Sequence, residues 1–132
     1  MRFEVRTSRR EEFVDITRQI AEQIAGSGVA SGVAVVSCPH TTAGITVNEN
    51  ADPDVVRDLL GALERLAPRD AGWRHAEGNA DAHVKATLIG AGATLPVSAG
   101  RLALGTWQAV YLGEFDGPRT RSVVVTVVPG LS

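Results

Sequence analysis

The sequence predicts a compact α+β domain spanning residues 1–132, with about three helices and a mainly antiparallel or mixed β-sheet. Short apolar or alternating runs recur along the chain, as strands do, and most connections between them are too short for parallel crossovers. Other segments repeat their apolar residues with the period of an amphipathic helix. No internal repeat, low-complexity tract or linker divides the chain, so we expect a single domain.

Composition narrows the class of protein. The apolar fraction is 44%, the charged fraction is 21% and the net charge is −2, which gives no sign of a nucleic-acid or membrane partner. The N-terminal residues lack the apolar core of a signal peptide, and no apolar run approaches the length of a membrane span. The single cysteine, Cys38, excludes an intrachain disulfide and fits a reducing compartment. We therefore expect a cytoplasmic protein.

The first forty residues predict strand, strand, helix, strand. Residues 2–7 alternate polar and apolar side chains, and residues 11–15 return as a second short strand. A helix follows and ends at Gly26-Ser27-Gly28. Its apolar stripe consists of Ile16, Ile20 and Ile24. Residues 31–39 then read as a buried strand, and the alternating residues 44–48 are expected to form a hairpin with it.

The second half predicts two helices and four strands. Asp52 can cap a helix that begins at Pro53 and stops at Pro68. Its buried stripe consists of Val55, Leu59, Leu63 and Leu66. Asn79 can cap a third helix over residues 80–89. Further strands are expected at residues 94–97, 101–104, 107–113 and 122–128, with Gly117-Pro118 as a turn.

The three histidines are the first candidates for chemistry. His40 precedes Thr41-Thr42, His75 stands two residues before Glu77, and His83 follows Asp81 at the same distance. Neutral imidazole is the commonest metal ligand in proteins, and a neighbouring carboxylate can orient its second nitrogen. The spacings match no established metal motif, so acid–base catalysis or plain hydrogen bonding at loops are alternatives.

Cationic and aromatic residues form the other candidates. Lys85 lies near a helix start, and Arg119 and Arg121 follow an acidic segment, so together they are suited to a phosphate or carboxylate. The alternative is that the two arginines pair with Glu114 and Asp116. In the segment Gly105-Thr106-Trp107-Gln108, the indole either borders a site or fills the core.

These residues carry a resemblance to a known family. The motifs are His40-Thr41-Thr42-Ala43-Gly44, Asn48-Glu49-Asn50, Asp52-Pro53 followed by Asp58, Trp73-Arg74-His75, residues 77–85, Leu104-Gly105-Thr106-Trp107-Gln108 and residues 114–121. Together they resemble the YjbQ-like family over nearly the whole chain. That family is often labelled secondary thiamine-phosphate synthase, and the resemblance implies an α+β fold that assembles as a homotrimer.

The resemblance also implies a reaction and roles for particular residues. A thiamine-phosphate synthase joins an aminopyrimidine methyl pyrophosphate to a thiazole phosphate and releases pyrophosphate. The catalytic residues would be His40, Glu49, Asp81 and His83. The substrate would be bound by Thr41, Thr42, Asn48, Lys85, Trp107, Arg119 and Arg121. A divalent metal ion would be held by His40, His75 and His83.

Two other classes of function use the same residues. One is a metal-dependent hydrolase or lyase that acts on a small phosphorylated metabolite. The other is a non-catalytic trimeric module that binds a metal or a ligand. Metal analysis and a thermal-shift screen with phosphorylated pyrimidines and thiazoles distinguish these classes.

Overall fold

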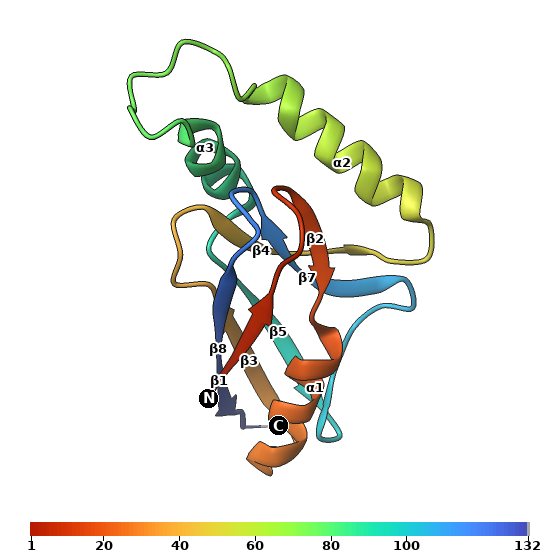
Figure 1. The fold of residues 1–132 in the computed structure, drawn as a ribbon. Helices are drawn as coiled ribbons and strands as arrows, with labels where there is room; N and C mark the ends of the chain where they lie inside the picture. The colour runs from red at the N-terminus through yellow and green to blue at the C-terminus, as the bar shows by residue number, and fades with distance from the viewer. Residues whose placement is uncertain (132) are drawn as a thin grey trace.

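The computed structural model describes residues 1–131. Within this range the chain forms eight strands and three helices, arranged as two antiparallel sheets (Figure 1). The strands are β1 (Arg2–Arg6), β2 (Glu12–Asp15), β3 (Gly32–Ser37), β4 (Ala43–Glu49), β5 (Gly92–Ser98), β6 (Arg101–Leu102), β7 (Gln108–Glu114) and β8 (Thr120–Pro129). The helices are α1 (Thr17–Ser27), α2 (Pro53–Leu66) and α3 (Ala80–Ile89). The α+β prediction is confirmed.

The larger sheet, sheet A, has the strand order β1-β8-β3-β5-β6. Its central strand β3 pairs with β8 on one side and with β5 on the other. Side chains alternate across the pleat, so Ala34 and Val36 point into the core and are fully buried. Val33 and Val35 point the other way and remain 38% and 36% exposed. The strand predicted as buried is therefore buried on one face only within this chain.

The smaller sheet, sheet B, has the strand order β2-β7-β4 and corrects one prediction. Residues 44–48 do not form a hairpin with β3, because β4 pairs along its whole length with β7. The Cys38 amide donates to the carbonyl of Ala91, and the Thr42 carbonyl accepts from the amide of Phe115. These two bonds turn the chain away from β3 and start β4 beside the end of β7. Alternation predicts a strand but does not select its partner.

The helix termini follow the sequence signals at α1 and α2. Asp52 caps α2 by accepting from the Asp54 amide at 2.9 Å, and Pro53 is the first helical residue. Helix α1 ends at Gly28, which adopts a φ of 73° that side chains disfavour. Its three stripe isoleucines are buried in the main core.

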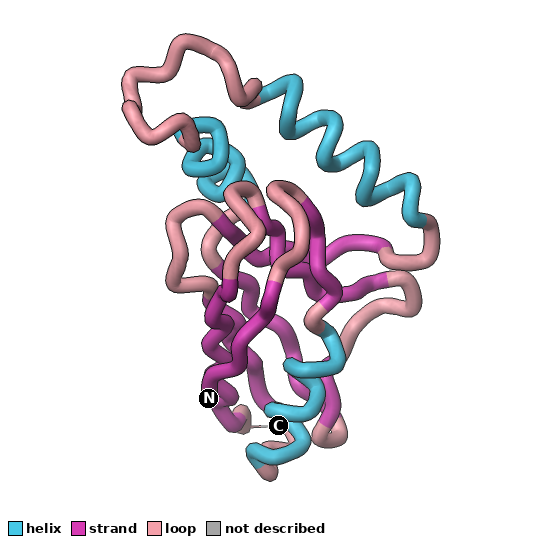
Figure 2. Tube along the Cα trace, viewed as in Figure 1, coloured by secondary structure: helices cyan, strands magenta, loops and turns pink. Residues whose placement is uncertain are grey.

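Helices α2 and α3 lie together at one end of the molecule. Figure 2 shows both helices at one end of the strands, joined by the loop at residues 67–79, while α1 lies beside the other end. Of the residues of α2, only Leu63 is buried, in a small cluster with Ala82, Ala86 and Phe115. Gly44 lets β4 pass the end of α3, because a Cβ there would lie 2.6 Å from the Gly90 carbonyl oxygen. None of the helices in residues 1–131 has the length and apolarity that a membrane crossing needs.

Candidate functional site

A polar cleft lies where three segments meet: the turn between β3 and β4, helix α3, and the turn between β7 and β8. It consists of two adjoining hollows of about 450 and 340 Å³. His40, Thr41 and His83 line both hollows. The second hollow adds the polar residues Thr42, Glu77, Asn79, Asp116, Arg119 and Arg121. The fold therefore brings together two histidines that are 43 residues apart in the sequence.

His40 continues the hydrogen bonding of sheet A beyond the end of β3. Strand β3 pairs with β8 as far as the Ser37–Val124 pair, after which the chain turns away. On β8, Ser122 comes two residues before Val124, so its amide points toward the same side of β8 as that of Val124, which is the side of β3. That amide donates to Nε2 of His40 at 2.9 Å. The imidazole thus takes the place of the missing strand.

The surroundings of His40 keep the ring neutral. Burial is the main cause that lowers the pKa of His40, and the positive charges of Arg121 and Arg2 lower it further, against an opposing effect of Glu114. A neutral ring whose Nε2 accepts a hydrogen bond carries its proton on Nδ1. His40 therefore stands in the cleft wall as a hydrogen-bond donor through Nδ1.

His83 lines the cleft and pairs with His75, which lies outside the cleft and lines a separate hollow formed by the loop at residues 67–79. Their ring centroids are 5.3 Å apart and the rings meet edge to face. His83 lies on α3, whereas His75 lies in the loop at residues 67–79. Nε2 of His75 is 3.7 Å from a carboxylate oxygen of Glu77, which itself lines the cleft. Three segments of the chain thus contribute the three histidines.

A buried ion pair forms the floor of the cleft. Arg121 is 4% exposed and Glu114 is fully buried, and the guanidinium donates through Nε and Nη2 to the two carboxylate oxygens. Nη2 also donates to Oγ1 of Thr42 at 2.8 Å. These contacts use Nε and Nη2 and do not involve Nη1. The predicted pairing of Arg121 with Glu114 and its predicted place in a binding cleft are therefore compatible.

A second ion pair lies at the rim of the cleft. Arg119 donates to Asp116 at 3.0 Å, and Asn79 donates through Nδ2 to the same carboxylate at 2.8 Å. Burial raises the pKa of Asp116, but the hydrogen bonds from Asn79 and Arg119 outweigh it and hold the pKa below its usual value. Asn79 is the N-cap residue of α3, but its side chain makes no capping hydrogen bond to the helix. Among the described residues 1–131, its buried Oδ1 has no hydrogen-bond partner.

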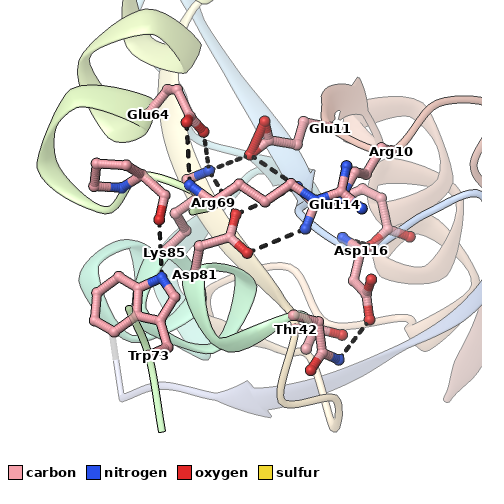
Figure 3. Close-up of polar contacts among 12 residues, drawn as sticks. Arg10, Glu11, Thr42, Glu64, Arg69, Trp73, Asp81, Lys85, Glu114 and Asp116 are labelled. Carbon is pink, nitrogen blue, oxygen red and sulfur yellow. Dashed lines mark hydrogen bonds and ion pairs between the residues drawn. The ribbon is translucent and has the colours of Figure 1, made fainter. Parts of the chain in front are cut away.

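Two predicted site residues lie outside the cleft, in what we call the Lys85 cluster: Arg10, Glu11, Glu64, Asp81 and Lys85. The fully buried ammonium of Lys85 contacts Glu11 at 2.6 Å, Glu64 at 2.7 Å and Asp81 at 2.9 Å (Figure 3). Arg10 donates to the fully buried Asp81 at 3.1 Å. Burial lowers the pKa of Lys85, but its three carboxylate partners outweigh this and raise it. The cluster ties α3 to α2 and to the β1–β2 turn.

Asn48, Glu49 and Trp107 lie at the far end of β4 from His40. Six residue steps separate Ala43 from Glu49, which is about 20 Å along a strand. Trp107 is 64% exposed, and its carbonyl accepts from the amide of Asn50. The carbonyl of Glu49 accepts from the hydroxyl of Tyr111 at 3.2 Å. Within one chain, the fold does not bring these three residues to the cleft.

Metal-ligating groups do not gather around the histidines in this conformation. Among residues 1–131, the only set of three or more His, Cys, Asp or Glu ligand atoms within 4.8 Å of one another is that of Glu11, Glu64 and Asp81. The ammonium of Lys85 already contacts all three. The divalent metal at His40, His75 and His83 stays a prediction.

Some cleft residues were not among the predicted site residues. The sequence predicts Asn79 only as a helix cap, and Glu114 and Asp116 only as partners of the arginines. The contribution of Ser122 is its backbone amide, for which a sequence gives no signal. The acidic segment that precedes Arg119 and Arg121 is the one signal in the sequence that indicates the buried ion pair of Arg121 with Glu114.

Comparison with known protein families identifies the class to which this chain belongs. The UPF0047 protein YjbQ-like family matches residues 1–130, and the chain belongs to this family. The UPF0047 protein YugU of Bacillus subtilis (strain 168) is 47% identical over 126 residues, which is 95% of this chain and 96% of the relative. A UPF0047 protein of Archaeoglobus fulgidus is 42% identical over 127 residues, covering 95% and 98% of the two chains.

Solved structures show the same fold. The crystal structure of an uncharacterised YjbQ/UPF0047 family protein from Clostridium acetobutylicum has a TM-score of 0.95 and 48% identity, covering 97% of this chain and 99% of that one. The crystal structure of a hypothetical protein from Aeropyrum pernix K1 has a TM-score of 0.93 and 38% identity, covering 98% of each chain.

Proposed function

We propose that the cleft binds a small phosphate-bearing metabolite and that the protein acts in the cytoplasm as a thiamine-phosphate synthase. The observation that supports this proposal is the convergence of donors on one cleft: His40, Thr41, Arg119 and Arg121 all line its second hollow. Phosphate oxygens accept hydrogen bonds from such groups, and guanidinium groups match their geometry and charge.

The donors of the cleft suit the group that leaves in this reaction. The bond between the pyrimidine methylene carbon and the pyrophosphate oxygen breaks, and the pyrophosphate leaves with the electron pair. The thiazole nitrogen supplies an electron pair to the same carbon, which forms the new C–N bond and leaves the positive charge on the thiazolium ring. Arg119 and Nη1 of Arg121 would stabilise the charge on the departing pyrophosphate. His83, across the cleft, would contact the substrate from α3.

The predicted metal ion fits only part of its predicted ligand set. Two imidazoles that bind one zinc ion at about 2.0–2.1 Å have centroids roughly 5–6 Å apart in tetrahedral geometry. The 5.3 Å between the centroids of His75 and His83 is compatible with this spacing, and it is also the ordinary distance of two rings packed edge to face. His40 does not fit, because its Nε2 already accepts from Ser122. A divalent ion held by His75 and His83 would supply a further positive charge for the phosphate groups.

The remaining predicted residues need a neighbouring chain. Asn48, Glu49 and Trp107 lie too far along β4 to reach the cleft of their own chain. We propose that the protein assembles as a homotrimer, in which these residues would have to reach the cleft of a neighbour to orient or stack on a substrate ring.

The proposal is tested with Arg119→Gln and a matched control, Arg57→Gln. Arg57 pairs with Asp54 at 3.1 Å three residues away, as Arg119 pairs with Asp116 at 3.0 Å, but it lies on α2 outside the cleft. Product formation is measured from aminopyrimidine methyl pyrophosphate and thiazole phosphate, and thermal shift is measured with pyrophosphate.

We expect Arg119→Gln to weaken pyrophosphate binding about tenfold or more, because it removes a charged donor, while Arg57→Gln stays within about twofold of the parent. A parent protein that forms no thiamine phosphate would refute the synthase assignment. Absence of any pyrophosphate-dependent shift would also refute the phosphate site.

A further inference from the structure

The hydrogen bond between His40 and Ser122 fixes what the imidazole can do. The backbone amide of Ser122 is only a donor, so Nε2 of His40 must be the acceptor in this 2.9 Å contact. An imidazolium ring has no acceptor nitrogen, and a neutral ring that accepts at Nε2 carries its only proton at Nδ1. The contact therefore selects one tautomer of one protonation state.

The strand register makes this contact a fixed part of the sheet. The amide of Ser122 faces the side of β8 on which β3 has already ended, after the Ser37–Val124 pair. Moving His40 away would leave this amide without its partner in a half-buried part of the sheet. The ring is therefore held in place before any ligand arrives.

This tautomer is unsuited to two of the roles that histidines commonly take. Nε2 cannot bind a metal ion or accept a substrate proton without giving up the Ser122 amide. Nδ1 carries a proton, so it has no lone pair for a metal ion or for a base. What remains is donation of a hydrogen bond from Nδ1–H to an oxygen acceptor.

The other groups beside His40 favour an anionic acceptor. Arg121, in the floor of the same hollow, keeps Nη1 free of its contacts with Glu114 and Thr42. Thr41 lines both hollows beside His40. The neutral ring, the hydroxyl and the guanidinium that line this hollow suit the oxygens of a phosphate group.

We propose that His40 is a neutral hydrogen-bond donor that holds a phosphate oxygen through Nδ1–H, and that it is neither a metal ligand nor a general base. This inference rests on the proposed phosphate site for the identity of the acceptor. It deepens that proposal, since it assigns the phosphate end of the ligand to the His40 side of the cleft and leaves any metal ion to His75 and His83.

The test uses a substitution that preserves both hydrogen bonds. In His40→Gln the side-chain carbonyl can accept from the Ser122 amide and the NH₂ group can donate into the cleft, but the metal-binding and basic nitrogens are lost. His40→Ala loses everything, and Ser122→Ala is the matched control because it retains the backbone amide. Pyrophosphate and Zn²⁺ binding are measured separately for each folded variant, and the tautomer of His40 in the parent is read from its ¹⁵N NMR shifts.

We expect the Nδ1–H tautomer in the parent and in Ser122→Ala. Pyrophosphate should bind His40→Gln within about threefold of the parent and His40→Ala at least about tenfold more weakly. Zn²⁺ binding, where the parent shows it, should survive His40→Gln.

Three results would overturn the inference: an Nε2–H or doubly protonated ring at neutral pH, equal pyrophosphate affinity in His40→Gln and His40→Ala, or Zn²⁺ binding abolished by His40→Gln. Failure of the parent to bind pyrophosphate, with the Nδ1–H tautomer observed, would instead refute the proposed phosphate site and remove the acceptor assigned to His40.

Discussion

Replacement of Lys85 by methionine should destabilise the protein strongly without touching the cleft. The ammonium has no exposed surface and contacts three carboxylates within 2.9 Å. Methionine retains most of the side-chain volume but leaves Asp81 as a fully buried carboxylate. Removing one partner of a buried ion pair costs far more than removing an exposed one, since the remaining charge loses its compensation without regaining water.

The expected loss lies at the lower end of the range for such pairs. Breaking a buried ion pair costs about 3–5 kcal/mol. Glu11 and Glu64 have side chains that are 24% and 47% exposed, so they can regain water, and Asp81 keeps its contact with Arg10. We therefore expect Lys85→Met to lower the free energy of unfolding by about 3 kcal/mol, which is a large part of the total unfolding free energy of a domain of this size. The melting temperature should fall by about 10–15 °C.

Urea unfolding followed by circular dichroism measures this loss, with Arg18→Met as the control. Arg18 also pairs with a glutamate, but its side chain is 90% exposed, so its loss should stay within about 0.5 kcal/mol. Adding Asp81→Asn to Lys85→Met removes the stranded charge and should cost less than the sum of the two single changes. A Lys85→Met variant as stable as Arg18→Met would refute the reasoning.

Acid should destabilise the fold through Asp81 and Asp116. Burial raises the pKa of each carboxyl group, but the hydrogen bonds from its partners outweigh burial and hold the pKa below its usual value. The free energy of unfolding should therefore stay constant above about pH 4 and fall as the pH drops through the folded-state pKa values of the two carboxyl groups. A urea midpoint that does not change between about pH 5 and about pH 2 would contradict this. Val35→Lys places a charge on the exposed face of sheet A and should dissociate an oligomer, whereas the control Leu88→Lys, also at an exposed apolar residue, should not. Light scattering that finds the parent protein monomeric at micromolar concentration would refute the proposed trimer. Trp107→Phe should keep the fold and weaken substrate binding, and equal binding would remove Trp107 from the site.

The sequence predicted the elements well because their signals are local. The isoleucine stripe of α1, the Asp52-Pro53 start of α2 and the alternation of β1 each depend on a few neighbouring residues. The pairing of β4 with β7 could not be predicted in this way, because it depends on bonds such as that between the Phe115 amide and the Thr42 carbonyl, 73 positions away.

The candidate site was predictable only in part, for a similar reason. The sequence predicts that His40 and His83 share a site, because each lies in a polar segment at the end of an element. Asp81 and Lys85 lie two residues on either side of His83, which is about 200° around a helix. The same helix start therefore directs His83 to the cleft and the other two side chains to the buried Lys85 cluster. Sequence periodicity alone did not indicate which face meets the cleft.

The enclosure of Lys85 has a consequence for the covalent chemistry of this protein. It is the only lysine in the sequence, so every ε-amine reaction must take place at this one side chain. In the closed state the amine is protonated and surrounded by carboxylates, and acylating reagents need a neutral, accessible nitrogen. Acylation of Lys85 therefore requires its amine to separate from Glu11, Glu64 and Asp81. The acylation rate, followed by mass spectrometry, would report how often the Lys85 cluster opens, with no other lysine to obscure the signal.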